Sequence, residues 1–276
     1  MKLGPRSKEE VGGTGALRLG NKGFPTPEQV GGRILCLAAL LRRCDVEAAL
    51  NAARRQGGQA AEVAAFGREA EEWAGEGLRR WITASGLAGY QSRREAALLG
   101  KTVGAWTQQE MIDAGWRLEA AGVLLWAVRR VDALPPWDEE FPRRLLVEEG
   151  IMTGDPKAAE AFRRGLALRP RRQLEHARDL AELWHWRSRT TTLQQRGQRL
   201  PEGLTFEKVV EMSAQAAAAK GYFTPIGGDF PALGKAYRDL DPEEFSRVTS
   251  IAVERHWALN WLCGFAADWD AVPTDT

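Results

Sequence analysis

The feature that most constrains the fold is a helix start signal that recurs along the chain. A Ser, Thr or Asp that precedes a Glu or Gln by three residues can cap a helix, because each of the two side chains accepts a backbone N–H. A proline directly after the capping residue fits the first helical position. Such signals occur at Thr26, Ser92, Thr107, Asp155 and Asp241. The sequence therefore predicts a helix that begins at each of these residues.

Stretches with helical periodicity lie between these signals and end at Gly or Pro. Besides the helix that follows Thr26, they span 45–56, 60–84, 107–131, 156–168, 171–196, 205–220 and 242–265. Few segments alternate with the period of a strand. The best exception, Tyr222–Tyr237, is rich in Gly and Pro and is interpreted as an ordered loop packed by its own apolar residues. We predict an all-α globular protein of about 8–10 helices with little or no sheet.

The chain divides into a tail and one helical domain. Residues 1–25 are rich in Gly and charge and lack apolar periodicity, which predicts a poorly ordered tail. Residues 26–276 are expected to form a single domain with packed lobes at about 26–135 and 155–276. Either lobe alone would leave apolar helix faces uncovered.

Charge and cysteine content restrict the partners and the compartment. The 38 basic and 37 acidic residues are spread along the chain and give a net charge of +1, so we expect no nucleic-acid partner. The three cysteines form no CxxC pair and are interpreted as core residues in a reducing compartment. The longest apolar run, Ile34–Leu41, is too short to span a bilayer, and no apolar leader follows the N-terminus. We expect a cytoplasmic protein without a membrane partner.

Two charged residues fall on helix faces that are otherwise apolar. Glu119 shares a face with Trp116, Val123 and Trp126, and Arg255 lies on the apolar stripe of the 242–265 helix. A buried carboxylate needs a cation, hydrogen-bond donors or a proton. The pattern therefore predicts a buried Glu119–Arg255 or Glu119–Arg33 ion pair. A carboxylate with a raised pKa that acts as a general acid or base is the alternative.

The C-terminal run adds a second group of polar residues. His256 and Asn260 share a helix face, and Asp268, Asp270 and Asp275 follow. An imidazole beside carboxylates could serve acid–base chemistry or bind a hard cation. The spacing matches no strict metal motif, so we expect neither a metal nor a cofactor. Alternatively, His256 and Asn260 hold down the irregular C-terminal segment by hydrogen bonds to its backbone.

Two sequence blocks resemble a known family. The blocks are WRLEAAGVLLWAV (116–128) and ERHWALNWLCGFAADWDAVPTDT (254–276). They resemble the signature blocks of a bacterial family catalogued as domain of unknown function 4272. The resemblance implies a compact helical bacterial protein and no particular reaction. The residues that match the blocks are Trp116, Arg117, Glu119, Arg255, Asn260, Trp261, Trp269 and Asp270.

Two hypotheses about function follow. Absent catalytic motifs, balanced charge and eleven tryptophans indicate a non-enzymatic module that binds or regulates a protein partner. The alternative is a hydrolase-type enzyme whose polar cleft lies between the 107–131 and 242–265 helices. Its catalytic candidates are Glu119, Arg255, His256 and Asp270. The first hypothesis predicts an exposed aromatic patch, and the second predicts a polar cleft.

Overall fold

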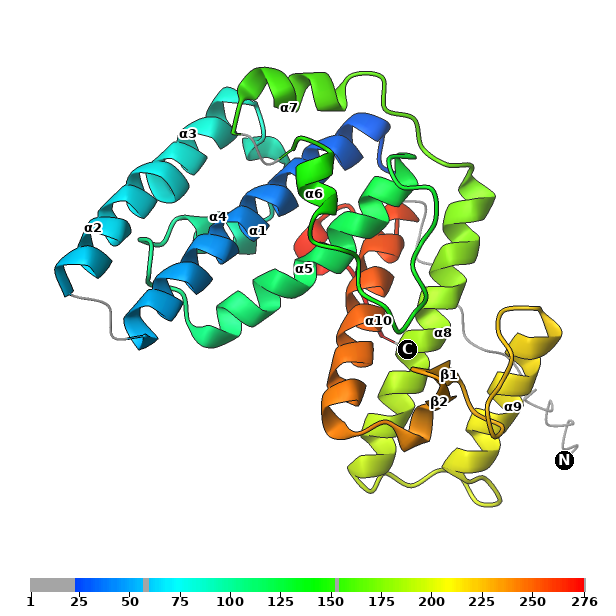
Figure 1. Ribbon diagram of the computed structural model, residues 1–276. Coiled ribbons are helices and arrows are strands. Elements are labelled where there is room, and N and C mark those ends of the chain that lie inside the picture. Colours follow the sequence, from blue (N-terminus) through cyan, green and yellow to red (C-terminus); the bar gives the residue numbers. More distant parts are fainter. Residues whose placement is uncertain (1–22, 57–59, 152–153, 276) are drawn as a thin grey trace, which may run out of the picture.

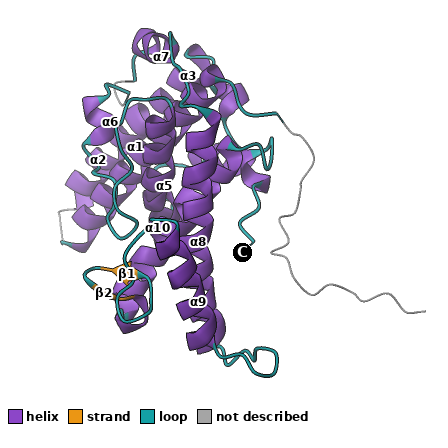
Figure 2. Ribbon diagram, turned by 90° about the vertical axis from the view of Figure 1, so that its right-hand side faces the viewer, coloured by secondary structure: helices purple, strands orange, loops and turns teal. Residues whose placement is uncertain are grey.

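The computed structural model describes residues 23–56, 60–151 and 154–275, and most of the predicted tail lies outside these ranges. The described chain is mostly helical and its one sheet has two strands of two residues each, which confirms the all-α prediction (Figures 1 and 2). The α-helices are α1 (Pro27–Arg55), α2 (Ala60–Ala70), α3 (Gly77–Ala84), α4 (Arg93–Leu99), α5 (Gln108–Ala127), α6 (Leu145–Glu148), α7 (Pro156–Arg163), α8 (Arg171–Gln195), α9 (Phe206–Ala219) and α10 (Pro242–Leu262). The shorter elements are the π-helical turn η1 (Glu71–Glu76), the 3-10 turns η2 (Ala88–Tyr90), η3 (Tyr237–Asp239) and η4 (Trp269–Ala271), and the strands β1 (Pro231–Ala232) and β2 (Lys235–Ala236).

The predicted helix starts are confirmed. Thr26, Ser92, Thr107 and Asp241 each form a complete capping box, and Asp155 caps α7 through the backbone N–H of Lys157. A cap of this kind stabilises a helix by about 1 kcal/mol. Local sequence therefore fixes where these five helices begin.

The predicted break before residue 45 is wrong, because α1 continues unbroken from Pro27 to Arg55. No Gly or Pro lies between Leu41 and Asp45 to end the helix. Arg43 and Glu47, one turn apart, form an ion pair of 2.8 Å across this region, and neither side chain is exposed. The pair supports helical continuity where sequence periodicity suggested two helices.

The helices form a row in which each packs on its neighbour. Figure 1 shows the α2–α3 segment beside α1, then α5, α10, α8 and finally α9. The main apolar core runs through the middle of the row and includes Leu37, Leu124, Ala181 and Leu259 from α1, α5, α8 and α10. The core therefore spans both predicted lobes. No helix in the described part of the chain is both long and apolar enough to cross a membrane.

The segment before α10 is an ordered loop with a very short hairpin. β1 and β2 pair as antiparallel two-residue strands, and Leu233 and Gly234 turn the chain with positive φ. Phe230 packs on Phe223, with ring centroids 4.7 Å apart, and on Trp184 of α8. The predicted self-packed loop is thus present, and its apolar residues also cover the middle of α8.

Candidate functional site

Glu119 of α5 and Arg255 of α10 form the buried ion pair that the helix faces predict. Arg255 Nε lies 2.8 Å from Glu119 Oε2, and the two residues are 0% and 1% exposed. The second carboxylate oxygen accepts the backbone N–H of Phe141 at 2.8 Å. The other guanidinium nitrogens donate to backbone carbonyls of Pro135–Glu139. The pair therefore fastens this loop to the contact between α5 and α10.

The alternative Glu119–Arg33 pair is wrong. Arg33 pairs with Glu95 of α4 and donates to the carbonyl oxygen of Tyr90 at 2.6 Å. Burial raises the pKa of Glu119, while Arg255 opposes that shift. With Arg255 bound to one oxygen and a backbone N–H to the other, this carboxylate is held as an ion-pair partner.

His256 of α10 contacts His185 of α8, with their Nδ1 atoms 3.0 Å apart. Asn260 fixes the tautomers of both rings. Its Oδ1 accepts from Arg178 Nε at 2.9 Å, so its amide nitrogen donates to His256 Nε2 at 2.9 Å and to the carbonyl of Pro273 at 2.7 Å. Since Nε2 of His256 is an acceptor, its Nδ1 carries the proton. This N–H donates a hydrogen bond to His185 Nδ1.

This network holds both imidazoles neutral. Burial lowers the pKa of His185 to about 4 and that of His256 to about 3. Asn260 provides the predicted hold on the C-terminal segment through Pro273, whereas His256 hydrogen-bonds only with side chains among the described residues. An imidazole with this pKa is a weak general base at neutral pH.

The other family-block residues make contacts outside these two networks. The carboxylate of Asp270, in η4, accepts the backbone N–H of Arg94 at the start of α4 at 2.9 Å. Trp261 and Trp269 pack edge to face, with ring centroids 5.4 Å apart. Arg117 pairs with Glu254 at 3.0 Å, and burial raises the pKa of that carboxyl to about 6.

The four catalytic candidates therefore fall into three separate networks. Glu119, Arg255 and His256 are at most 1% exposed, so solvent does not reach them in this conformation. Asp270 lies apart and serves α4. Within the described ranges, no group of three or more His, Cys, Asp and Glu side chains is arranged to hold a metal ion.

Tryptophan exposure identifies a residue that the sequence patterns did not. Of the eleven tryptophans, ten are buried or half-buried, which fits a Trp-rich core. Trp73 is the exception, at 52% exposed. Phe66 and Val147, at 37% and 68%, line a hollow together with it. Exposed aromatic and apolar side chains that gather in this way are typical of contact surfaces.

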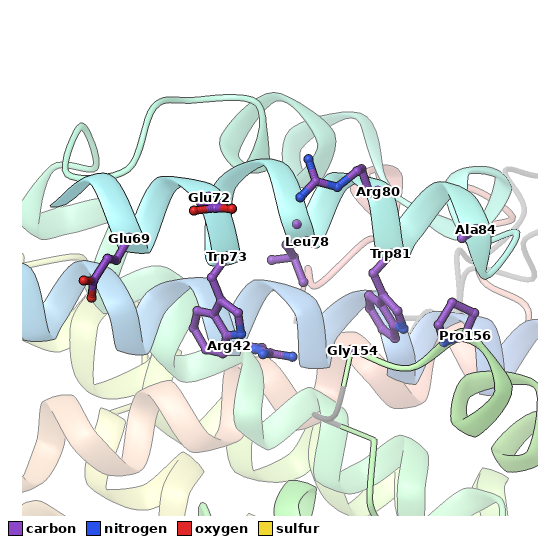
Figure 3. Close-up of a pocket in the computed structure, with 11 residues that line it drawn as sticks. Arg42, Glu69, Glu72, Trp73, Leu78, Arg80, Trp81, Ala84, Gly154 and Pro156 are labelled. Carbon is purple, nitrogen blue, oxygen red and sulfur yellow. The ribbon is translucent and has the colours of Figure 1, made fainter. Parts of the chain in front are cut away.

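Trp73 lies in an open groove between α1 and the helical rod made of α2, η1 and α3. One hollow of about 600 Å³ is lined by residues that include Arg42, Glu69, Glu72, Trp73, Trp81 and Pro156 (Figure 3). A second hollow, of about 300 Å³, shares Arg42 and Trp73 with the first and reaches Phe66 and Val147. We call the two connected hollows the Trp73 groove.

The π-helical turn places Trp73 at this groove. Residues 60–84 form the continuous helix that the sequence predicts, since Ala70 and Gly77 on either side of η1 keep right-handed helical dihedrals. Within η1, a Cβ atom on Gly75 would lie 2.3 Å from Glu71 Oε1. Glu71 is held there by the backbone N–H of Val103 and by Arg79. π-Helical turns are rare and frequently occur at functional sites.

Some of the charged side chains around the groove have a partner, and others have none among the described residues. The Arg42 guanidinium stacks over the Trp73 ring at 3.9 Å from its centroid, and burial lowers the pKa of Arg42. Arg80 pairs with Glu76 on the rod. Glu69 and Glu72 are exposed, one turn apart, and have no ion-pair partner in the part of the chain that the structure describes.

The sequence carries only a faint indication of this site. Trp73 sits among charged residues and glycines, in EEWAGEG, but the buried Trp269 also lies between two charged residues, Asp268 and Asp270. Local sequence therefore does not distinguish Trp73 from a buried tryptophan. Its exposure depends on the π-helical turn and on the position of α1, neither of which can be deduced from local periodicity.

Comparison with known proteins identifies the family. The family described as a domain of unknown function (DUF4272) matches residues 20–214. This range contains the 116–128 block and ends before the 254–276 block. No curated protein and no solved structure matches the chain. Because the family match covers more than half of the 276 residues, this protein belongs to the DUF4272 family.

Proposed function

We propose that this protein is a non-enzymatic interaction module that binds a protein partner through the Trp73 groove. The observation that carries the proposal is the exposure of Trp73, at 52%, in a chain that shields its other ten tryptophans. A large aromatic residue in a partly enclosed hollow is the usual anchor of a protein interface. The groove is open to solvent along its length, as expected for a surface that accepts another chain.

The enzyme alternative has less support. Its proposed cleft lies where α5 and α10 pack directly on each other. Arg255 is hydrogen-bonded to Glu119 and to backbone carbonyls of the 135–141 loop. His256 is bound on both ring nitrogens. These side chains have no free atom for a substrate without first breaking contacts that hold helices together.

The cysteines support a reducing compartment, and we place the module in the cytoplasm. Cys36 and Cys44 are buried free thiols, and Cys263 is a half-buried one. Burial raises the pKa of Cys36 and of Cys263 to about 12, so neither thiol is a reactive nucleophile at neutral pH.

Site-specific cross-linking in the native host tests the proposal. A photo-reactive residue, p-benzoylphenylalanine, at position 73 is expected to capture one protein species, because Trp73 would contact the partner directly. The same residue at position 212 is the matched control, since Met212 is 58% exposed but lies on α9 at the far end of the row. Capture of the same species from both positions, or of none from position 73, would contradict the proposal.

Stability measurements separate a binding role of Trp73 from a folding role. We expect Trp73→Ala to lower the free energy of unfolding by no more than about 1 kcal/mol, because its ring is already half in water. Trp81→Ala is the matched comparison on the same rod, only 6% exposed, and should cost about 3 kcal/mol. Urea unfolding followed by circular dichroism measures both. Equal losses would show that Trp73 serves folding instead.

A further inference from the structure

We propose, building on the protein-binding role above, that the occupant of the Trp73 groove is a basic amphipathic helix of the partner. A large apolar side chain of that helix packs against Trp73, and Lys or Arg side chains pair with Glu69 and Glu72. Three features of the described residues carry this inference: two carboxylates on the rod without an ion-pair partner, the apolar floor of the groove, and a buried N–H without an acceptor.

The rod has an excess of negative charge at the groove. Residues 60–84 contain five Glu and three Arg. Arg79 and Arg80 are already engaged by Glu71 and Glu76, at 3.0 and 3.2 Å. Glu69 and Glu72, three residues apart on the helix, have no ion-pair partner in the described structure, and the two arginines that line the same hollow are already engaged, Arg80 by Glu76 and Arg42 by the Trp73 ring. A partner that carried carboxylates here would be repelled, whereas ammonium or guanidinium groups would be attracted.

The floor of the groove is apolar and follows the rod. Phe66 and Trp73 come from the rod, Val147 comes from α6, and Leu78 and Trp81 line the part of the groove that includes Pro156. Figure 3 shows Trp73, Arg42, Trp81 and Pro156 in one line along the groove. An apolar strip bordered by charge on one side matches an amphipathic helix, which presents an apolar stripe flanked by charged residues.

Trp81 adds a polar requirement at one end of the groove. It is 6% exposed, and its indole N–H has no hydrogen-bond acceptor among the described residues. The nitrogen edge of the ring lies on the side toward Pro156 (Figure 3). A buried donor without an acceptor is uncommon in folded proteins. A carbonyl or hydroxyl oxygen from an occupant at this end would supply the missing acceptor.

An unbiased peptide selection tests the chemistry of the occupant. A phage-displayed library of random peptides of about 16 residues, long enough for four helical turns, is selected on the immobilised full-length protein. We expect enriched sequences with a positive net charge and an apolar stripe. Fluorescence anisotropy then measures their affinity for the wild type, Trp73→Ala, Glu69→Gln/Glu72→Gln and the control Glu202→Gln/Glu211→Gln, whose two exposed glutamates lie near and on α9.

The variants distinguish the possible outcomes. Affinity should fall roughly 30-fold in Trp73→Ala, as for a central interface anchor, and roughly tenfold in Glu69→Gln/Glu72→Gln, with little change in the control. Acidic or neutral peptides that still require Trp73 would overturn the basic helix but leave the protein-binding groove intact. Peptides that bind Trp73→Ala as tightly as the wild type, or no enrichment at all, would overturn both. A dimer in sedimentation that Trp73→Ala dissociates would identify a second copy as the occupant and exclude the basic helix.

Discussion

Replacing Arg255 with Met is expected to lower the free energy of unfolding by about 4 to 5 kcal/mol. The substitution leaves the Glu119 carboxylate buried at 1% exposure with only the Phe141 N–H as a partner. It also removes the donors to backbone carbonyls of Pro135–Glu139. A buried charge without a partner and buried carbonyls without a donor both lose their hydrogen bonds to water on folding. No protein group replaces those bonds, so the folded state is destabilised. Urea unfolding at pH 7.5 measures the loss.

A second variant separates the charge from the packing. Glu119→Leu/Arg255→Met removes both charges and should be more stable than Arg255→Met alone, because no isolated carboxylate remains. Arg117→Met is the matched control, since Arg117 also lies on the α5–α10 contact but is 20% exposed where it pairs with Glu254. We expect the control to cost less, about 1 to 2 kcal/mol, because the Arg117 and Glu254 side chains are 20% and 12% exposed and Glu254 can take up a proton. If Arg255→Met loses less stability than is expected for Arg117→Met, the 135–141 loop does not depend on the Glu119–Arg255 pair.

Local rules account for most of the fold. The caps at Thr26 and Thr107 are contained within four residues of sequence, so no tertiary information is needed to predict where α1 and α5 begin. The Glu119–Arg255 pair follows from a different rule, that a charge on an apolar stripe needs a partner. That rule predicts that Glu119 needs a cation but does not identify it. The choice between Arg33 and Arg255 depends on how the helices pack.

These local rules do not predict the candidate groove. Trp73 and Trp81 are eight residues apart on one predicted helix, and nothing in their spacing distinguishes an exposed indole from a buried one. The difference arises from the π-helical turn and from where α1 crosses the rod. The contact between His185 and His256 cannot be predicted from local sequence either, because 71 residues separate the two rings. Both features depend on helix packing, which periodicity does not specify.

The buried histidine pair predicts a strong loss of stability in acid. Both folded-state pKa values, about 4 for His185 and about 3 for His256, lie below the unfolded value of 6.5. The stabilisation is therefore complete above pH 6.5 and is lost as the pH falls toward the folded values. At pH 5 the unfolded chain has bound a proton at each ring and the folded chain has not, which costs about 2 kcal/mol per histidine relative to pH 7.5.

The groups around the pair strengthen this expectation. Arg189 lowers the pKa of His185 further, and Asp275 raises it. His185 and Arg178 lower the pKa of His256 further, and the hydrogen bond with Asn260 raises it. Because both folded values lie at or below about 4, the loss at pH 5 depends on the unfolded state and changes little if either value moves by half a unit. The expected total is about 4 kcal/mol between pH 7.5 and pH 5.

Other carboxyl groups also titrate in this range, so the measurement must isolate the two rings. The difference in pH dependence between the wild type and His185→Gln/His256→Gln should equal the expected 4 kcal/mol, because neither glutamine binds a proton. His176→Gln, at an exposed position on α8, the helix that carries His185, should retain the wild-type dependence of stability on pH. Nitrogen NMR shifts should further show the proton of His256 on Nδ1 and that of His185 on Nε2, as the hydrogen bonds through Asn260 require. Two rings that titrate near pH 6.5, or a double variant as sensitive to acid as the wild type, would mean that the α8–α10 contact opens to water before it unfolds.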